Sequence, residues 1–246
     1  MYALMQKRPV LHAVAWILIY LVLFNVGEGI AEATGFAYAT AALVLALAIV
    51  MVIYLVRGKQ MRATGFKRIG NSDLKATLYY APLALLAVIQ LFAGVDPTVT
   101  GAQIAGIVLL MIGVGFVEAV TMRGLLYQGI AKQSGMWRAI LITGVTFGLG
   151  HIVNLLRGYD MAELSAQIVV AVAIGIVLAL LVAVTGNIVP GILFHVLFNI
   201  TGSIANTESA TMMILLAVIL VVCVLYGWVL IRQLSRARLT PNRARS

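Results

Sequence analysis

Four polar side chains interrupt stretches of this chain that are otherwise apolar: a carboxyl group at Glu118, imidazoles at His151 and His195, and an amide at Asn199. A charged side chain at the centre of a bilayer costs about 2.5–3.5 kcal/mol on insertion scales, so such residues usually face inward and serve a function. A carboxylate can act as a general base on water, and imidazole and amide donors can stabilise an oxyanion. These residue types therefore predict a hydrolytic site.

The surrounding apolar stretches predict the elements that carry these residues. The chain has 246 residues, of which 63% are hydrophobic and only 10% are charged, whereas a soluble domain is about 25% charged. Runs approach the roughly 20 residues needed to cross a bilayer at 10–27, 36–56, 77–95, 102–128, 138–156, 165–185, 187–204 and 209–231. We predict an all-α polytopic membrane protein, a bundle of about eight transmembrane helices with an intramembrane polar cavity, forming one membrane domain over residues 1–246.

The distribution of charge predicts how these helices are oriented. Nearly all of the 17 lysines and arginines fall in loops on one side of the arrangement, while most acidic residues fall on the other side. Because basic loops stay in the cytoplasm, we expect both termini there, with a basic cytoplasmic tail at 232–246. The net charge of +9 thus reflects the membrane and anionic lipid, and we expect no nucleic-acid partner. We assign the protein to a bacterial or archaeal cell membrane.

Helix geometry predicts that the polar residues lie at overlapping depths. At 1.5 Å per residue, Glu118 and His151 lie about 20 Å from the cytoplasmic helix ends, Asn199 about 18 Å and His195 about 12 Å. His195 and Asn199 are four residues apart and share a helix face, as do Phe147 and His151. All four polar groups could therefore meet in one cavity, open toward the cytoplasm.

Each of these residues also has a structural interpretation. An intramembrane histidine or Asn199 can form a hydrogen bond between helices, and Arg123, near the cytoplasmic end, can extend to lipid phosphates. Other protease chemistries lack their motifs, since the chain has no G-x-S-x-G and no H-E-x-x-H, and its one cysteine, Cys223, lies in an apolar run. A metal ion held by Glu118, His151 and His195 remains an alternative.

The chain contains three short motifs, and their order resembles that of the CAAX protease and bacteriocin-processing family, also called CPBP or Abi. These intramembrane glutamic endopeptidases are related to the Ras-converting CAAX prenyl endopeptidase. The family pattern is E-E-x-x-x-R, then F-x-x-x-H, then H-x-x-x-N or D, on successive membrane helices. It is matched here by Glu118 to Arg123, Phe147 to His151 and His195 to Asn199. The resemblance covers a motif-bearing core of about 100–205.

The resemblance implies roles for these residues. Glu118 and His151 would activate the attacking water, and His195 and Asn199 would form the oxyanion hole, with Arg123 as a supporting residue. Phe147, which opens the second motif, would also be a supporting residue. Family members are regarded as metal-independent, so no cofactor is expected. The implied substrate is a peptide or membrane protein, prenylated or not, and bacterial members are linked to peptide maturation and bacteriocin immunity.

One position departs from the family pattern. Ala119 stands where the family has its second glutamate, and on an α-helix position 119 lies one turn before Arg123. We therefore expect Arg123 to find another acceptor, either a lipid phosphate or a carbonyl group. A non-catalytic immunity or regulatory membrane protein remains an alternative function, and a small proton-coupled transporter is a third.

Overall fold

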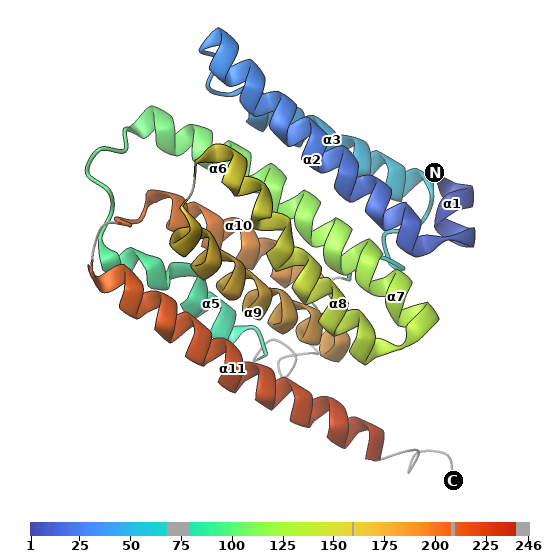
Figure 1. Ribbon diagram of the computed structural model, residues 1–246. Coiled ribbons are helices and arrows are strands. Elements are labelled where there is room, and N and C mark those ends of the chain that lie inside the picture. The colour runs from blue at the N-terminus through green and yellow to red at the C-terminus, as the bar shows by residue number, and fades with distance from the viewer. Residues whose placement is uncertain (68–78, 159, 208–209, 240–246) are drawn as a thin grey trace.

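Helices account for every regular element in the computed structural model, which describes residues 1–67, 79–158, 160–207 and 210–239 (Figure 1). An isolated bridge between Val95 and Ala205 is the sole strand-like pairing within these ranges. The all-α prediction is therefore confirmed. The elements are α1 Tyr2–Lys7, α2 Pro9–Thr34, α3 Ala39–Arg57, α5 Ala81–Val88, η2 Ile89–Ala93, α6 Gly101–Ala119, η3 Val120–Leu126, α7 Tyr127–Ser134, α8 Met136–Leu149, η4 Gly150–Arg157, α9 Met161–Thr185, α10 Val189–Ile204 and α11 Ala210–Leu239.

Within the described residues, six helices are long and apolar enough to cross a bilayer, so this is an integral membrane protein. In Figure 1 the pair α2 and α3 lies along one side of the bundle and α11 along the other, with α8 and α9 between them. The expected C-terminal tail begins as a continuation of α11 to Leu239, and residues 240–246 lie outside the described part. The six spans are Pro9–Thr34, Ala39–Arg57, Gly101–Ser134, Met136–Leu155, Leu164–Thr185 and Thr211–Arg236.

Two of the eight expected spans are shorter than their apolar sequence suggested. The runs at 77–95 and 187–204 fold as Ala81–Ala93 and Val189–Ile204, which at 1.5 Å per residue fall short of a 30 Å hydrocarbon core. Hydropathy does not register where a helix breaks: Gly94, at φ +89, ends η2, and α10 begins only at Val189, with Pro190 in its first turn.

The two short helices nevertheless join the same ends of the bundle as the long ones. At one end, Ile188 N donates to Gly65 O across 3.0 Å, and at the other Asp96 N donates to Ile204 O across 2.9 Å. Side chains also tie the helices to each other, since Gln90 Nε2 donates to Phe198 O and Thr201 Oγ1 to Ala87 O, at 2.9 and 2.7 Å. Such bonds satisfy backbone groups that lipid cannot.

The helix that carries Glu118 changes its winding directly after this residue. α6 ends at Ala119, residues Val120–Leu126 form the π-helix η3, and α7 completes a continuous helix to Ser134. At the change of winding, the Thr121 hydroxyl donates to Val117 O at 2.8 Å and Glu118 O at 3.2 Å. π turns are rare and occur frequently at functional sites.

Close approach of α8 and α9 holds the end of α8 in place. A Cβ atom at Gly144 would lie 2.9 Å from Ile176 N, and one at Gly148 would lie 2.9 Å from Ile168 O. These contacts are too short for any side chain, so both glycines permit the backbones to meet, as small residues do in membrane helix pairs. The pairing fixes the part of α8 that leads to His151.

This close packing leads to a stability prediction. Gly148→Ala should lower the free energy of unfolding of the detergent-solubilised protein by about 1–3 kcal/mol, because the added methyl group must push the α9 backbone away. Its melting temperature should fall accordingly. The matched control is Gly29→Ala on α2, where a Cβ atom would meet nothing within 4 Å. Equal melting temperatures for the two variants would contradict the close approach of α8 and α9.

Candidate active site

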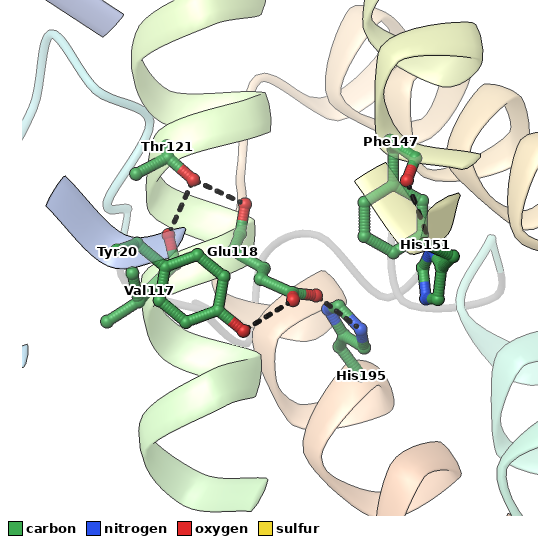
Figure 2. Close-up of polar contacts among 7 residues, drawn as sticks. All are labelled: Tyr20, Val117, Glu118, Thr121, Phe147, His151 and His195. Atoms are coloured by element: carbon green, nitrogen blue, oxygen red, sulfur yellow. Dashed lines mark hydrogen bonds and ion pairs between the residues drawn. The ribbon is translucent and has the colours of Figure 1, made fainter. Parts of the chain in front are cut away.

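The carboxylate of Glu118 is held between two helices that lie far from it in the sequence (Figure 2). The Tyr20 hydroxyl on α2 donates to Oε1 of Glu118 at 2.7 Å, and Nε2 of His195 on α10 lies 3.3 Å from Oε2. The Glu118 side chain is only 17% exposed. Hydrogen bonds that involve a charged group are about twice as strong as neutral ones, so these two contacts orient the carboxylate firmly.

The ring of His195 has one nitrogen without a hydrogen-bond partner among the described residues. His195 is buried, and its Nε2 atom faces Glu118. Its Nδ1 atom is also buried and has no hydrogen-bond partner among the described residues. A buried polar atom without a partner is unusual in a folded protein and calls for a ligand, a water molecule or a catalytic role.

Phe147 connects the two histidines. Its ring meets those of His151 and His195 edge to face, with centroids 5.4 and 5.3 Å apart. His151 lies in η4, directly after α8, and its Nδ1 atom is 3.2 Å from Phe147 O (Figure 2). Because a carbonyl oxygen can only accept, this contact places the proton on Nδ1 and leaves a lone pair on Nε2.

The expectation for Arg123 is wrong. Its side chain reaches neither a lipid phosphate nor a carbonyl group but is buried, at 3% exposure, with Cζ lying 4.3 Å above the centre of the Phe147 ring. Neither Nη atom has a hydrogen-bond partner, and the guanidinium forms no ion pair within the described residues. The physical reason is the π-helix, which is wound less tightly than an α-helix and so rotates Arg123 toward the side on which Glu118 lies.

Asn199 stays apart from these contacts. It lies one turn after His195 on α10 and is partly buried, and its amide makes no hydrogen bond to any described residue. The structure thus links Glu118, His195, Phe147, His151 and Arg123 through contacts, while Asn199 is placed near them only by its position on the helix. It also brings Glu118 next to His195, whereas the sequence comparison paired Glu118 with His151.

Tyr20 is a site residue that the sequence analysis missed. It is buried on a face of α2 that also holds His12 and Trp16, and the indole Nε1 of Trp16 donates to His12 Nε2 at 3.0 Å. These residues follow one another every four positions, so they form a stripe along one side of the helix. That regular spacing of polar aromatic residues in an apolar helix was the available signal.

A pocket of about 410 Å³ lies toward the end of the bundle where α1, α2 and α7 meet. Its lining does not include Glu118, His151, His195 or Asn199. The pocket and the Glu118 contacts are therefore separate features, although η3 contributes to both. The pocket's polar and charged lining comes from Gln6, His12, Gln60, Thr64, Gln128 and Lys132, and the η3 residues in its wall are Gly124 and Leu125.

No group of three or more His, Cys, Asp or Glu side chains is arranged to hold a metal ion in the part of the chain that the structure describes. Glu118 and His195 lie close together, but His151 contacts neither of them through a polar atom. The metal alternative named from the sequence thus lacks an assembled set of ligands, and a chelation experiment can test it.

Comparison with known proteins supports the reading of the motifs. Residues 100–201 match the model of a family described as Rce1-like, type II CAAX prenyl endopeptidase. No curated protein and no solved structure gives a significant match to the chain. The matched range contains all three motifs but excludes Tyr20, which reaches the site from outside it.

The contact between Tyr20 and Glu118 predicts that these residues are coupled energetically. In a double-mutant cycle of Tyr20→Phe and Glu118→Met, the coupling free energy of unfolding in detergent should be about 0.5–3 kcal/mol. Tyr127→Phe on α7 is the matched control, since the Tyr127 hydroxyl makes no hydrogen bond to the described residues and should show no coupling to Glu118. A coupling near zero for Tyr20 would show that the two side chains do not interact.

Proposed function

We propose that this protein, a membrane hydrolase that carries an Rce1-like domain over residues 100–201, is an intramembrane endopeptidase that uses a water molecule activated by Glu118 and His151. Its substrate would be a peptide bond in a membrane-associated protein or peptide, of CAAX or bacteriocin type. The observation that carries the proposal is the Glu118 carboxylate, which Tyr20 and His195 hold in place within a helix bundle. A preorganised base in a water-poor site is what peptide hydrolysis requires.

In the first step, Glu118 takes a proton from water while the water oxygen bonds to the carbonyl carbon of the substrate. Tyr20 would act as a positioning residue, because its hydroxyl fixes the direction of the carboxylate. His151 can assist, since its contact with Phe147 O leaves Nε2 with a lone pair that can accept a proton.

The carbonyl oxygen becomes an oxyanion in this step and needs donors. Nδ1 of His195 is buried and without a partner among the described residues. Once Glu118 has taken the proton from water it can donate to Nε2 of His195, and a ring that carries its one proton on Nδ1 can then donate to the oxyanion. The amide of Asn199, one turn further along α10, can supply a second donor once a substrate is bound. Both groups lie on α10, which is tied to α5 and η2 by side-chain hydrogen bonds and is therefore a firm support.

In the second step, the bond between carbon and nitrogen breaks. The proton taken from water passes through Glu118 or His151 to the leaving nitrogen, so the first products are a carboxylic acid and an amine. Transfer of the acid's proton to the amine then gives a carboxylate and an ammonium group. No proton is gained or lost overall.

We place the site within reach of the cytoplasm, with both termini on that side, because the basic residues Lys59, Arg62 and Lys132 lie toward the end of the bundle that the positive-inside rule assigns to it.

A non-catalytic immunity or regulatory role is the second candidate function. Ala119 leaves the buried Arg123 without a carboxylate partner on its own helix, which is a departure from the family pattern in the site itself. Such a protein would keep the fold and lose the chemistry. The experiment that tests the protease separates the two functions.

Removal of the general base should abolish cleavage. In cells that produce Glu118→Gln, peptides released by the wild-type protein should disappear, and the cleavage rate should fall by roughly 100-fold or more, because the amide cannot accept a proton from water. Mass spectrometry of membrane peptides from the two strains measures this. The matched control is Glu28→Gln, which changes an exposed acid on α2 that bonds only to Thr40.

Two outcomes would contradict the proposal. Cleavage that persists in purified Glu118→Gln protein would exclude Glu118 as the base. If neither the wild-type strain nor the Glu118→Gln strain releases peptides, and the Glu118→Gln strain keeps full biological activity, the immunity or regulatory role is supported.

Chelation tests the metal alternative. Since Glu118, His151 and a water molecule suffice for the proposed steps, the purified protein should keep its cleavage activity after dialysis against EDTA. The assay compares the rate before dialysis, after dialysis and after addition of zinc. A loss of activity that zinc restores would instead favour a metal held by Glu118, His151 and His195.

A further inference from the structure

The guanidinium of Arg123 is a buried cation that forms no ion pair with any residue that the structure describes. The side chain is 97% enclosed, both Nη atoms lack a hydrogen-bond partner, and no carboxylate oxygen of a described residue lies within 4.0 Å of it. Its Cζ atom lies 4.3 Å from the centre of the Phe147 ring, over the face of that ring. Buried charges in proteins are paired or bind a ligand, so this cation is incomplete in the isolated chain.

The position of the guanidinium connects it to the proposed reaction centre. Phe147, on whose face it lies, also packs against the rings of His151 and His195, and His195 is 3.3 Å from the Glu118 carboxylate. Arg123 is thus separated from both histidines by a single aromatic ring. A group that binds Arg123 would therefore be held beside a peptide bond that Glu118 could attack.

The chemistry of the side chain defines what would bind. A guanidinium presents paired N–H donors in a plane that match the two oxygens of a carboxylate, and a ring beneath it keeps this plane fixed. We infer that Arg123 binds a carboxylate of the peptide substrate and thereby selects substrates that carry one near the scissile bond. This inference rests on the proposed endopeptidase function and adds a specificity determinant to it.

A purely structural role fits the observations less well. An apolar side chain could pack against the Phe147 ring equally well. Replacing buried charges with apolar groups of similar volume is also often neutral or stabilising. A residue that lowers stability and is placed beside a reaction centre is typical of a binding function. Position 119 on the same helix is a buried alanine, and Glu118 contacts Tyr20 and His195 without forming an ion pair with Arg123.

Two parts of a peptide could supply the carboxylate. One is the C-terminal main-chain carboxylate of a substrate that is cut near its end, and the other is an Asp or Glu side chain. An extended chain covers about 3.3–3.6 Å per residue, so either group could reach Arg123 from within a few residues of the scissile bond. The experiment below distinguishes these sources.

Cleavage of matched peptides tests the inference. The probes are quenched fluorescent libraries of apolar peptides, one pair ending in a free acid or an amide, and a second pair with an internal Asp or Asn and an amidated end. The wild-type protein should cleave one acid form with a kcat/KM roughly 10- to 100-fold above its neutral partner, as expected for a hydrogen bond to a charged group. The pair that shows the difference identifies the source.

Variants then assign this preference to Arg123. Arg123→Met should cleave acid and neutral forms at the same rate, and Arg123→Lys should keep part of the preference because it retains the charge without the planar pair of donors. The control is Arg138→Met, which removes an exposed cation from the start of α8 and should leave the preference intact. Arg123→Met should melt at the same temperature as the wild type or higher.

The outcomes separate this inference from the proposed function. If neither library pair is cleaved in a Glu118-dependent way, the endopeptidase proposal fails. If cleavage occurs without an acid preference, or Arg123→Met keeps the preference, only the carboxylate role is overturned. A Arg123→Met variant that loses rate equally on both forms would instead assign the guanidinium to the oxyanion, and one that unfolds would assign it to the packing of the bundle.

Discussion

A carboxylate that is enclosed by membrane-spanning helices needs donors to take the place of water, and the contacts of Glu118 meet this need. Tyr20 of α2 donates to one oxygen and His195 of α10 approaches the other. These residues come from the two sides of the Glu118 helix, so the arrangement exists only when α2, α6 and α10 are packed together. The contacts of this carboxylate therefore join the N-terminal helices to the region 100–201 that matches the Rce1-like family model.

The rest of the bundle holds this arrangement in two ways. The short helix α10 is joined to η2 by a side-chain hydrogen bond from Gln90 and to α5 by one from Thr201, and these bonds fix the register of α10 and hence the position of His195. On the other side, Gly144 and Gly148 let the backbone of α8 approach that of α9 closely, and His151 follows directly after α8. The two histidines that contact Phe147 therefore lie on α10 and directly after α8, and both of these helices are held by close contacts with their neighbours.

The π-helix after Glu118 explains the most unusual feature of the site. It directs Arg123 into the protein, where the guanidinium lies over Phe147 and forms no ion pair with the residues that the structure describes. An arginine in this state is stabilised in part by the aromatic ring, since a desolvated cation over a ring gains about 2 kcal/mol, which is less than a buried charge loses when its partner is absent. The remaining deficit is what a substrate carboxylate would offset.

Much of the protein follows from the sequence alone. Apolar composition and the lengths of the runs determined the all-helical membrane fold, because lipid leaves few other ways to satisfy the backbone. The order of Glu118, His151 and His195 indicated the family whose model matches residues 100–201. Only the tertiary structure decided which side chains contact one another in the site. Tyr20 lies 98 residues from Glu118, and Arg123, in the π-helix η3, is buried instead of extending to lipid. The helix Ala81–Ala93 ends before its apolar run does, and α10 begins after its run has begun. Residue types and spacing describe single helices, whereas distances between side chains depend on how helices rotate and pack against one another.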